Sequence, residues 1–368
     1  MKKLFLILAL MASLSLDAQF VTTFAKNAPE AQEDGFIYYL PQNVIKLDFT
    51  IEETNYYIGP FAEFATKMLG ITDYIKENRT EYVIKDVNIQ IANEKDSNAV
   101  YYVTTDEKSK EPLPNFILDD DGIILAVGYD NIPSKLKIKP NTFSYSELNT
   151  VDENDFSFVT ILDDDVDIDD DDDEEEGAAP KKITKEDRAM TAVEKIARIR
   201  NAYFDLVTGA QEISAGDIKY MAESIKALED EYVSLFKGKV VTKTYKKTVF
   251  VTPEKNQINS AVTVAKISST EGFTEGNGKG DLIKIQYDSN YSLSNVNPIS
   301  DESKNASQSN KLFYRVPVET NVKVLFGNAV LAEKVLNISQ FGEIRTISVK
   351  NNKIIFNPNT GQIISIQK

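Results

Sequence analysis

Residues 184–236 read TKEDRAMTAVEKIARIRNAYFDLVTGAQEISAGDIKYMAESIKALEDEYVSLF, and this stretch gives the strongest local signal in the chain. Thr184 stands three positions before Asp187, the spacing of a capping box, in which both side chains accept hydrogen bonds from free backbone N–H groups. Gly209 stands where a helix that ends in the left-handed conformation favours a residue without Cβ. The pattern predicts a helix that begins after Thr184 and ends before Gly209.

A second helix is predicted directly after the first. Ser214 and Asp217 repeat the capping spacing, and Gly238 follows the last apolar residue. Apolar residues recur at helical spacing in both segments: Ala189, Ala192, Val193, Ile196, Ile199, Tyr203, Leu206 and Val207, then Ile218, Met221, Ile225, Leu228, Tyr232 and Leu235. Because such faces pack along each other, we expect an antiparallel hairpin that braces the fold.

Strand-like sequence lies on both sides of this hairpin. Alternation typical of half-buried strands occurs at residues 44–51, 82–92, 239–251 and 312–326. The sequence therefore predicts an α+β fold, in which two β-rich modules at 19–162 and 239–368 flank a central antiparallel helical hairpin at 183–238.

Local signals add detail to the two modules. Residues 61–69 predict one short helix that ends at Gly70, and the DDDG at 119–122 predicts a turn between two strands. The YYLP of residues 38–41 and the YRVP of residues 314–317 each place an aromatic residue three positions before a proline that opens a strand. This echo indicates either two related modules or a chance similarity.

The first eighteen residues have the pattern of a secretory signal. Lys2 and Lys3 precede an apolar run at 4–16 that is too short to span a bilayer. We expect cleavage between Ala18 and Gln19, and no transmembrane segment in the mature chain.

Two residue types are missing, and each excludes chemistry. The 368-residue chain contains no cysteine, which excludes disulfides, thiolate catalysis and attachment of a lipid to cysteine. It also contains no histidine, which excludes Ser–His–Asp triads, histidine bases and histidine-ligated zinc. Any enzyme built on this chain has to work with carboxylates, lysine, tyrosine or hydroxyl groups.

The net charge of −16 is concentrated in one segment. Residues 163–176 are acidic at every position except two, so we expect 163–182 to be a disordered acidic linker. Four of these acids, Asp165, Asp167, Asp169 and Glu176, have the spacing of ligands in a Ca²⁺ loop. Asp170, however, stands where that loop needs glycine for its sharp turn. The match therefore favours a solvated linker over an ordered metal site.

Tyrosines offer a candidate binding face. Three Tyr-Tyr pairs precede the hairpin, and neighbouring side chains in a strand point to opposite faces of the sheet. One member of each pair is thus expected to face outward. The candidates for a sugar- or peptide-stacking face are Tyr38, Tyr56, Tyr101 and Tyr314. The alternative is ordinary packing of half-buried strands. No catalytic residue and no cofactor site is predicted.

Several blocks of sequence resemble the DUF4831 family of exported Bacteroidota proteins, a domain of unknown function. They are GFIYYLP at 35–41, IGPFAEFATKMLGI at 58–71, IARIRNAYFDLVTG at 196–209, EDEYVSLFKGK at 229–239, FYRVP at 313–317, SQFGEI at 339–344 and NTGQIISI at 359–366. The blocks occur in order along nearly the whole mature chain. The resemblance implies no catalytic residues and no established activity. It implies a place in the periplasm or at the periplasmic face of the outer membrane.

Besides a periplasmic Ca²⁺ buffer that acts through the acidic run at 163–176, two functional hypotheses remain open from the sequence. The first is a non-enzymatic binding or scaffold component of the cell envelope whose partner is another envelope protein or a glycan, and not nucleic acid. The second is a carbohydrate- or peptide-processing enzyme that uses only carboxylates. An enzyme requires two acids facing each other across a cleft, one of them with a raised pKa.

Overall fold

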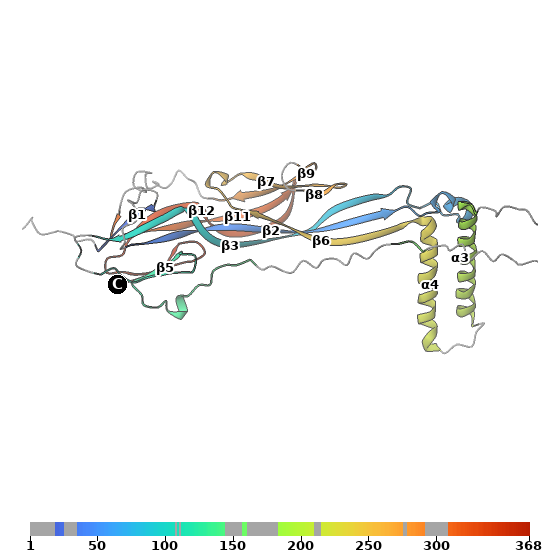
Figure 1. Cartoon of the computed structure of the whole chain (residues 1–368), viewed down its shortest axis with the longest axis horizontal. Helices are drawn as coiled ribbons and strands as arrows, with labels where there is room; N and C mark the ends of the chain where they lie inside the picture. The colour runs from blue at the N-terminus through green and yellow to red at the C-terminus, as the bar shows by residue number, and fades with distance from the viewer. Residues whose placement is uncertain are drawn as a thin grey trace, which may run out of the picture.

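The computed structural model describes residues 19–25, 35–106, 109, 112–143, 157–159, 183–209, 215–274, 278–290 and 308–368. Figure 1 shows a long β body with two helices standing at one end, across its long axis. A mixed α+β fold is thereby confirmed. The expected signal at 1–18 and the expected linker at 163–182 lie outside the described residues. Among the described residues, none of the helices has the length and apolar character needed to cross a membrane.

Three antiparallel sheets form the body. Sheet 1 has the order β10 (Gln308–Ser309), β1 (Phe20–Phe24), β3 (Arg79–Thr105), β2 (Gly35–Tyr57), β6 (Lys239–Val251). Sheet 2 has the order β12 (Ala329–Ser348), β11 (Lys311–Phe326), β9 (Asp281–Asp288), β7 (Ala261–Ser268), β8 (Gly272–Thr274). Sheet 3 has the order β14 (Ile363–Gln367), β13 (Lys353–Phe356), β5 (Ile124–Val127), β4 (Phe116–Leu118). Short 3₁₀ turns occur at η2 (Ala62–Phe64), η3 (Ser134–Leu136) and η5 (Lys255–Gln257).

Strands from both sides of the helical hairpin share two of these sheets. In sheet 1, β2 pairs with β6 from Ile45–Val251 to Tyr57–Lys239. In sheet 3, β5 pairs with β13. The expectation of two separate β-rich modules is therefore wrong, because strands before and after the hairpin complete each other's backbone hydrogen bonds.

The strands of sheet 1 are longer than the sequence pattern indicated. The segment expected at 82–92 is part of one strand, β3, of 27 residues. Both prolines of the YYLP and YRVP echo lie inside strands, at shifts of register next to Pro41 and Pro317. Proline has no N–H to donate, and a bulge is a position where a strand tolerates that loss. The prolines therefore bend their strands and do not open them.

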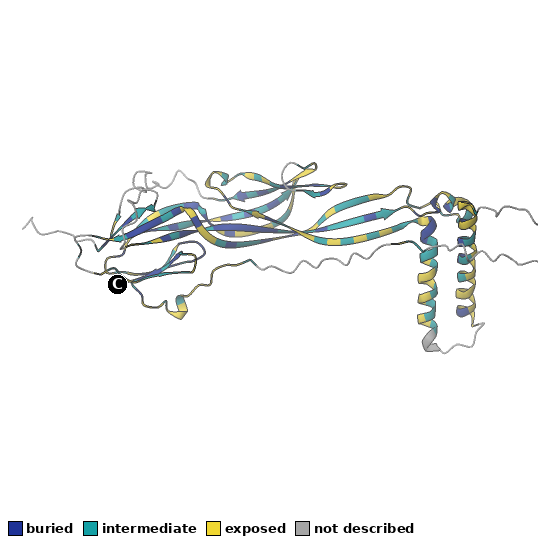
Figure 2. Cartoon of the chain, viewed as in Figure 1, coloured by how far each residue is buried: buried dark blue, intermediate teal, exposed yellow. Residues whose placement is uncertain are grey.

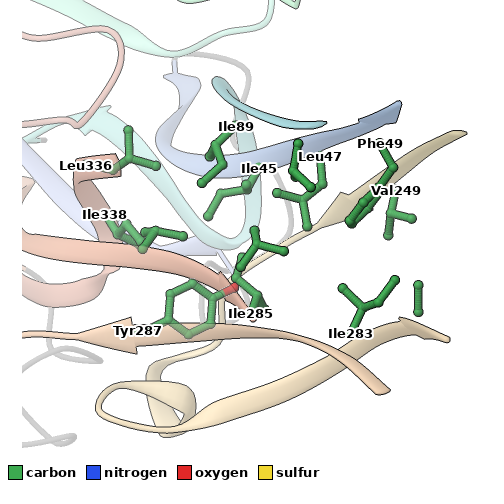
Figure 3. Close-up of a cluster of buried hydrophobic side chains, with 14 of the residues drawn as sticks. Ile45, Leu47, Phe49, Ile89, Val249, Ile283, Ile285, Tyr287, Leu336 and Ile338 are labelled. Atoms are coloured by element: carbon green, nitrogen blue, oxygen red, sulfur yellow. The ribbon is translucent and has the colours of Figure 1, made fainter. Parts of the chain in front are cut away.

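The first core lies between sheets 1 and 2 (Figure 3). Alternate residues of β2 fill it, and their side chains are fully buried: Ile45, Leu47, Phe49 and Ile51. Ile283, Ile285 and Tyr287 of β9 face them from sheet 2. A second core lies at the other end of the body, where sheet 3 and β11 cover β1, β2 and β3.

The helices form as their sequence predicts. In α3 (Lys185–Thr208), the Thr184 hydroxyl accepts from the Asp187 N–H at 3.2 Å, and the Asp187 carboxylate accepts from the Thr184 N–H at 2.8 Å. Gly209 ends α3 with a φ of 74°. The short helix α2 (Ala65–Leu69) likewise ends at a left-handed Gly70. The second hairpin helix is α4 (Ala215–Lys237), and the expected cap at Ser214 and Asp217 lies among residues whose side chains are not described.

Among the residues that the structure describes, the hairpin packs on the body at its base. A small cluster there is formed by Phe61, Ala65, Ala189, Ala192, Ile196, Leu235 and Phe236. From this base the two helices project away from the long axis of the body (Figure 1). The expectation of a brace between β modules is therefore wrong, because sheets 1 and 3 join the two halves directly. We call α3 and α4 the helical arm.

Candidate binding sites

The four candidate tyrosines do not form one exposed face. Tyr38 is fully buried and Tyr101 is 2% exposed, because sheet 3 and β11 cover this end of sheet 1. Their rings stack in the second core with 5.3 Å between centroids, and Tyr101 stacks on Phe313 at 4.3 Å. The Tyr38 hydroxyl accepts from the Phe313 N–H at 2.9 Å. These two tyrosines are core residues, so their assignment to a binding face is wrong.

The other two tyrosines lie apart from that stack. Tyr56 lies near the end of β2 that carries the arm, with the Arg79 guanidinium 3.8 Å from its ring centroid, and its hydroxyl donates to Glu81 at 3.2 Å. Tyr314 is half-buried beside the second core. For Tyr56 and Tyr314, ordinary packing of half-buried strands fits the structure better than a binding face does.

The metal candidates Asp165, Asp167, Asp169 and Glu176 lie outside the described residues. Within the described ranges, no three His, Cys, Asp or Glu side chains come together in a group able to hold a metal ion.

Buried polar side chains join the three sheets. Asn43 of β2 donates to the Asn359 carbonyl at 2.9 Å and accepts from the Ser339 N–H of β12 at 2.8 Å. Asn359 lies between β13 and β14, so this one side chain links all three sheets. Arg315 of β11 donates to the Asp96 carboxylate of β3, and both side chains are less than a tenth exposed. These contacts satisfy polar groups inside the body, and their role is structural.

One carboxyl group with a raised pKa also has a structural role. Burial raises the pKa of Asp119, although hydrogen bonds from the Ile123 and Asp121 N–H groups oppose that rise. These bonds cap the DDDG turn that joins β4 and β5, which confirms the expected turn.

A polar groove of about 570 Å³ lies on the outer face of sheet 2. Strand alternation creates it. Val318, Val322 and Val324 of β11 point into the first core, and Thr320 is buried on the same side. Glu319, Asn321 and Lys323 therefore point outward. The pairing register places Asn321 of β11 between Asp288 of β9 and Val335 of β12. The outward positions of three neighbouring strands thus form the floor of the groove.

Asp288 is the most firmly held group in the groove. Its Oδ1 accepts from Gln286 Nε2 at 2.6 Å, and its Oδ2 accepts from Lys323 Nζ at 2.9 Å. The bond from Gln286, followed by the bond from Lys323, lowers the pKa of Asp288. The carboxylate therefore stays charged at neutral pH, which suits a hydrogen-bond acceptor and not a proton donor.

Two asparagines complete the polar lining. Asn321 donates from Nδ2 to the Glu333 carboxylate, while its buried Oδ1 has no partner among the described residues. Asn259 adopts a left-handed φ of 56°, and its Oδ1 accepts from the Ser289 N–H at 2.8 Å. That bond orients the remaining amide N–H groups of Asn259. Only the polar alternation of Glu319, Asn321 and Lys323 signalled this site in the sequence.

The helical arm carries exposed apolar side chains on both of its helices. Both helices carry exposed positions along their length (Figure 2). The exposed large side chains are Tyr203, Phe204 and Val207 on α3, and Tyr220 and Leu228 on α4. Phe204 is 66% exposed and Tyr220 is 74% exposed. The expectation that Tyr203, Val207 and Leu228 pack inside the hairpin is wrong, because these side chains are 40%, 59% and 47% exposed.

Comparison with known proteins gives one finding. The family model described as Domain of unknown function (DUF4831) matches residues 34–364. No curated protein and no solved structure matches the chain.

Proposed function

This chain belongs to the DUF4831 family, whose function is unknown, and we propose that it is a non-enzymatic binding or scaffold component of the cell envelope. The amino-terminal pattern of Lys2 and Lys3 followed by an apolar run supports export. The proposed place is the periplasm or the periplasmic face of the outer membrane.

The observation that carries this proposal is the helical arm. The 24 residues of α3 span about 36 Å at roughly 1.5 Å per residue. The residues that seat the arm on the body, such as Ala192 and Ile196, lie in the first half of α3, whereas Phe204 and Val207 lie in the exposed second half. Exposed aromatic side chains on a projecting element are typical of protein-binding surfaces. We therefore propose that the arm binds another envelope protein.

The carboxylate enzyme is the alternative function. It requires a carboxylic acid that is protonated at neutral pH in a cleft. In the groove on sheet 2, the lowered pKa of Asp288 supports binding over proton donation.

The test is a pull-down of the full-length protein after reversible cross-linking in the cells that produce it. We expect a reproducible protein partner with the natural chain and its loss with Phe204→Asp, which changes an exposed side chain. Ile366→Asp is the control, since Ile366 is 50% exposed and lies on β14 near the carboxyl terminus, at the end of the body away from the arm. Recovery of the same partner with Phe204→Asp would show that the arm does not bind that partner.

A further inference from the structure

We propose that the groove on the outer face of sheet 2 is a binding site for a neutral saccharide. Its volume of about 570 Å³ lies within the range of small-molecule sites, roughly 300–1,000 Å³. This inference is independent of the arm, because it concerns other residues and another class of ligand.

The charges of the groove favour a neutral ligand. Asp288 is paired with Lys323 at 2.9 Å, so the two charges on the floor offset each other. Glu319 adds a negative charge at an exposed position of the lining. An anionic ligand would be repelled by these carboxylates, and a metal ion would have to displace Lys323 from Asp288.

The polar groups match the hydroxyl groups of a sugar. A hydroxyl group both donates and accepts hydrogen bonds, and the groove offers partners of both kinds. Asp288 accepts one hydrogen bond on each carboxylate oxygen and keeps lone pairs for a further donor. Asn259, held by its bond to the Ser289 N–H, presents an amide donor. A sugar hydroxyl can therefore donate to Asp288 and accept from Asn259.

An apolar side chain completes the match. Val335 is 61% exposed and pairs directly with Asn321 across β11 and β12. A sugar ring has one face made of C–H groups, and burying that face against Val335 and Pro317 removes apolar surface from water. A groove that has both hydrogen-bonding groups and an apolar side chain fits a saccharide better than it fits a small polar ion.

The first experiment applies the full-length protein to an array of neutral, anionic and amino-sugar glycans. The best neutral glycan is then titrated by calorimetry. Val335→Glu places a charge at the groove without touching the core. Val330→Glu is the matched control, because it makes the same change at a 50% exposed valine of the same strand that does not line the groove.

The proposal expects binding to neutral glycans, at least tenfold weaker binding with Val335→Glu, and unchanged binding with Val330→Glu. Asn321→Ala is expected to weaken binding by a similar factor. If that variant melts at a lower temperature, the pair of valine variants decides alone. No binding at millimolar glycan, binding confined to anionic or amino-sugar glycans, or equal binding by the two valine variants would each overturn the proposal.

Discussion

Arg315 of β11 and Asp96 of β3 form a buried ion pair that joins sheet 2 to sheet 1. Burial lowers the pKa of Arg315, and the charge of Asp96 opposes that effect. Removing either partner leaves the other charge inside the body without compensation, which is the costly way to break a buried pair. A single substitution in this pair is therefore expected to weaken the contact between the two sheets.

Arg315→Ala is expected to lower the free energy of unfolding by about 3–5 kcal/mol, as measured by urea denaturation. Lys67→Ala is the control, because Lys67 pairs with Glu186 at 2.6 Å on the surface, with side chains 70% and 52% exposed. Exposed pairs contribute about 1 kcal/mol or less. Similar losses in both variants would contradict the structural role given to Arg315.

Gly342 of β12 lies against the partner strand. A Cβ at this position would overlap the Val316 carbonyl oxygen beside the Pro317 bulge. Gly342→Ala is therefore expected to destabilise the protein by about 3 kcal/mol, measured as a fall in melting temperature. Gly327 has a φ of 58° and open space around it, so Gly327→Ala should cost only about 1 kcal/mol of backbone strain. The reverse order of these losses would exclude the close approach at Gly342.

The buried tyrosines predict how stability changes at high pH. Burial raises the pKa of Tyr38, Tyr101 and Tyr287. A group whose pKa is higher in the folded state contributes stability below its unfolded pKa, about 10 for tyrosine, and that stability is lost as pH rises toward the folded pKa. We expect the protein to unfold above about pH 10.

The measurement is a titration that follows tyrosinate absorbance and circular dichroism together. The exposed tyrosines should ionise first, and the buried ones should ionise only as the fold is lost. Ionisation of every tyrosine in a still-folded protein would contradict their burial.

The base of the arm predicts a local loss of stability. Ile196 is 1% exposed in the cluster at the base, and Ile196→Ala is expected to cost about 2–5 kcal/mol. Hydrogen exchange should show that loss in α3 and α4, while β9 and β11 keep their protection. Met190→Ala is the control at a 48% exposed position of the same helix, with an expected change within about 0.5 kcal/mol. Faster exchange in β9 or β11 would show that the loss of stability extends from the arm to the core of the body.

Local structure followed from the sequence, and long-range structure did not. The limits of α3 depend on Thr184, Asp187 and Gly209, which act within a turn or two of their own helix. The pairing of β2 with β6 joins residues about two hundred positions apart, and alternation alone names no partner strand. The expectation of two modules failed for that reason.

The prediction of a binding face formed by tyrosines was wrong for a related reason. Alternation shows which residues of a strand share a face but not what covers that face. Tyr38 and Tyr101 were predicted to face outward, but sheet 3 and β11 cover them. The groove required Asn321, Asp288 and Val335 to meet through the register of three strands. Only the outward polar positions of β11 were visible beforehand.

We propose that the arm, and not the β body, contacts a protein partner. The most direct measurement places a photo-cross-linking amino acid at position 204 of the full-length protein in the cells that produce it, with position 366 as the control. We predict a discrete cross-linked protein adduct from position 204 and none from position 366. No adduct from 204, or the same adducts from both positions, would contradict the claim.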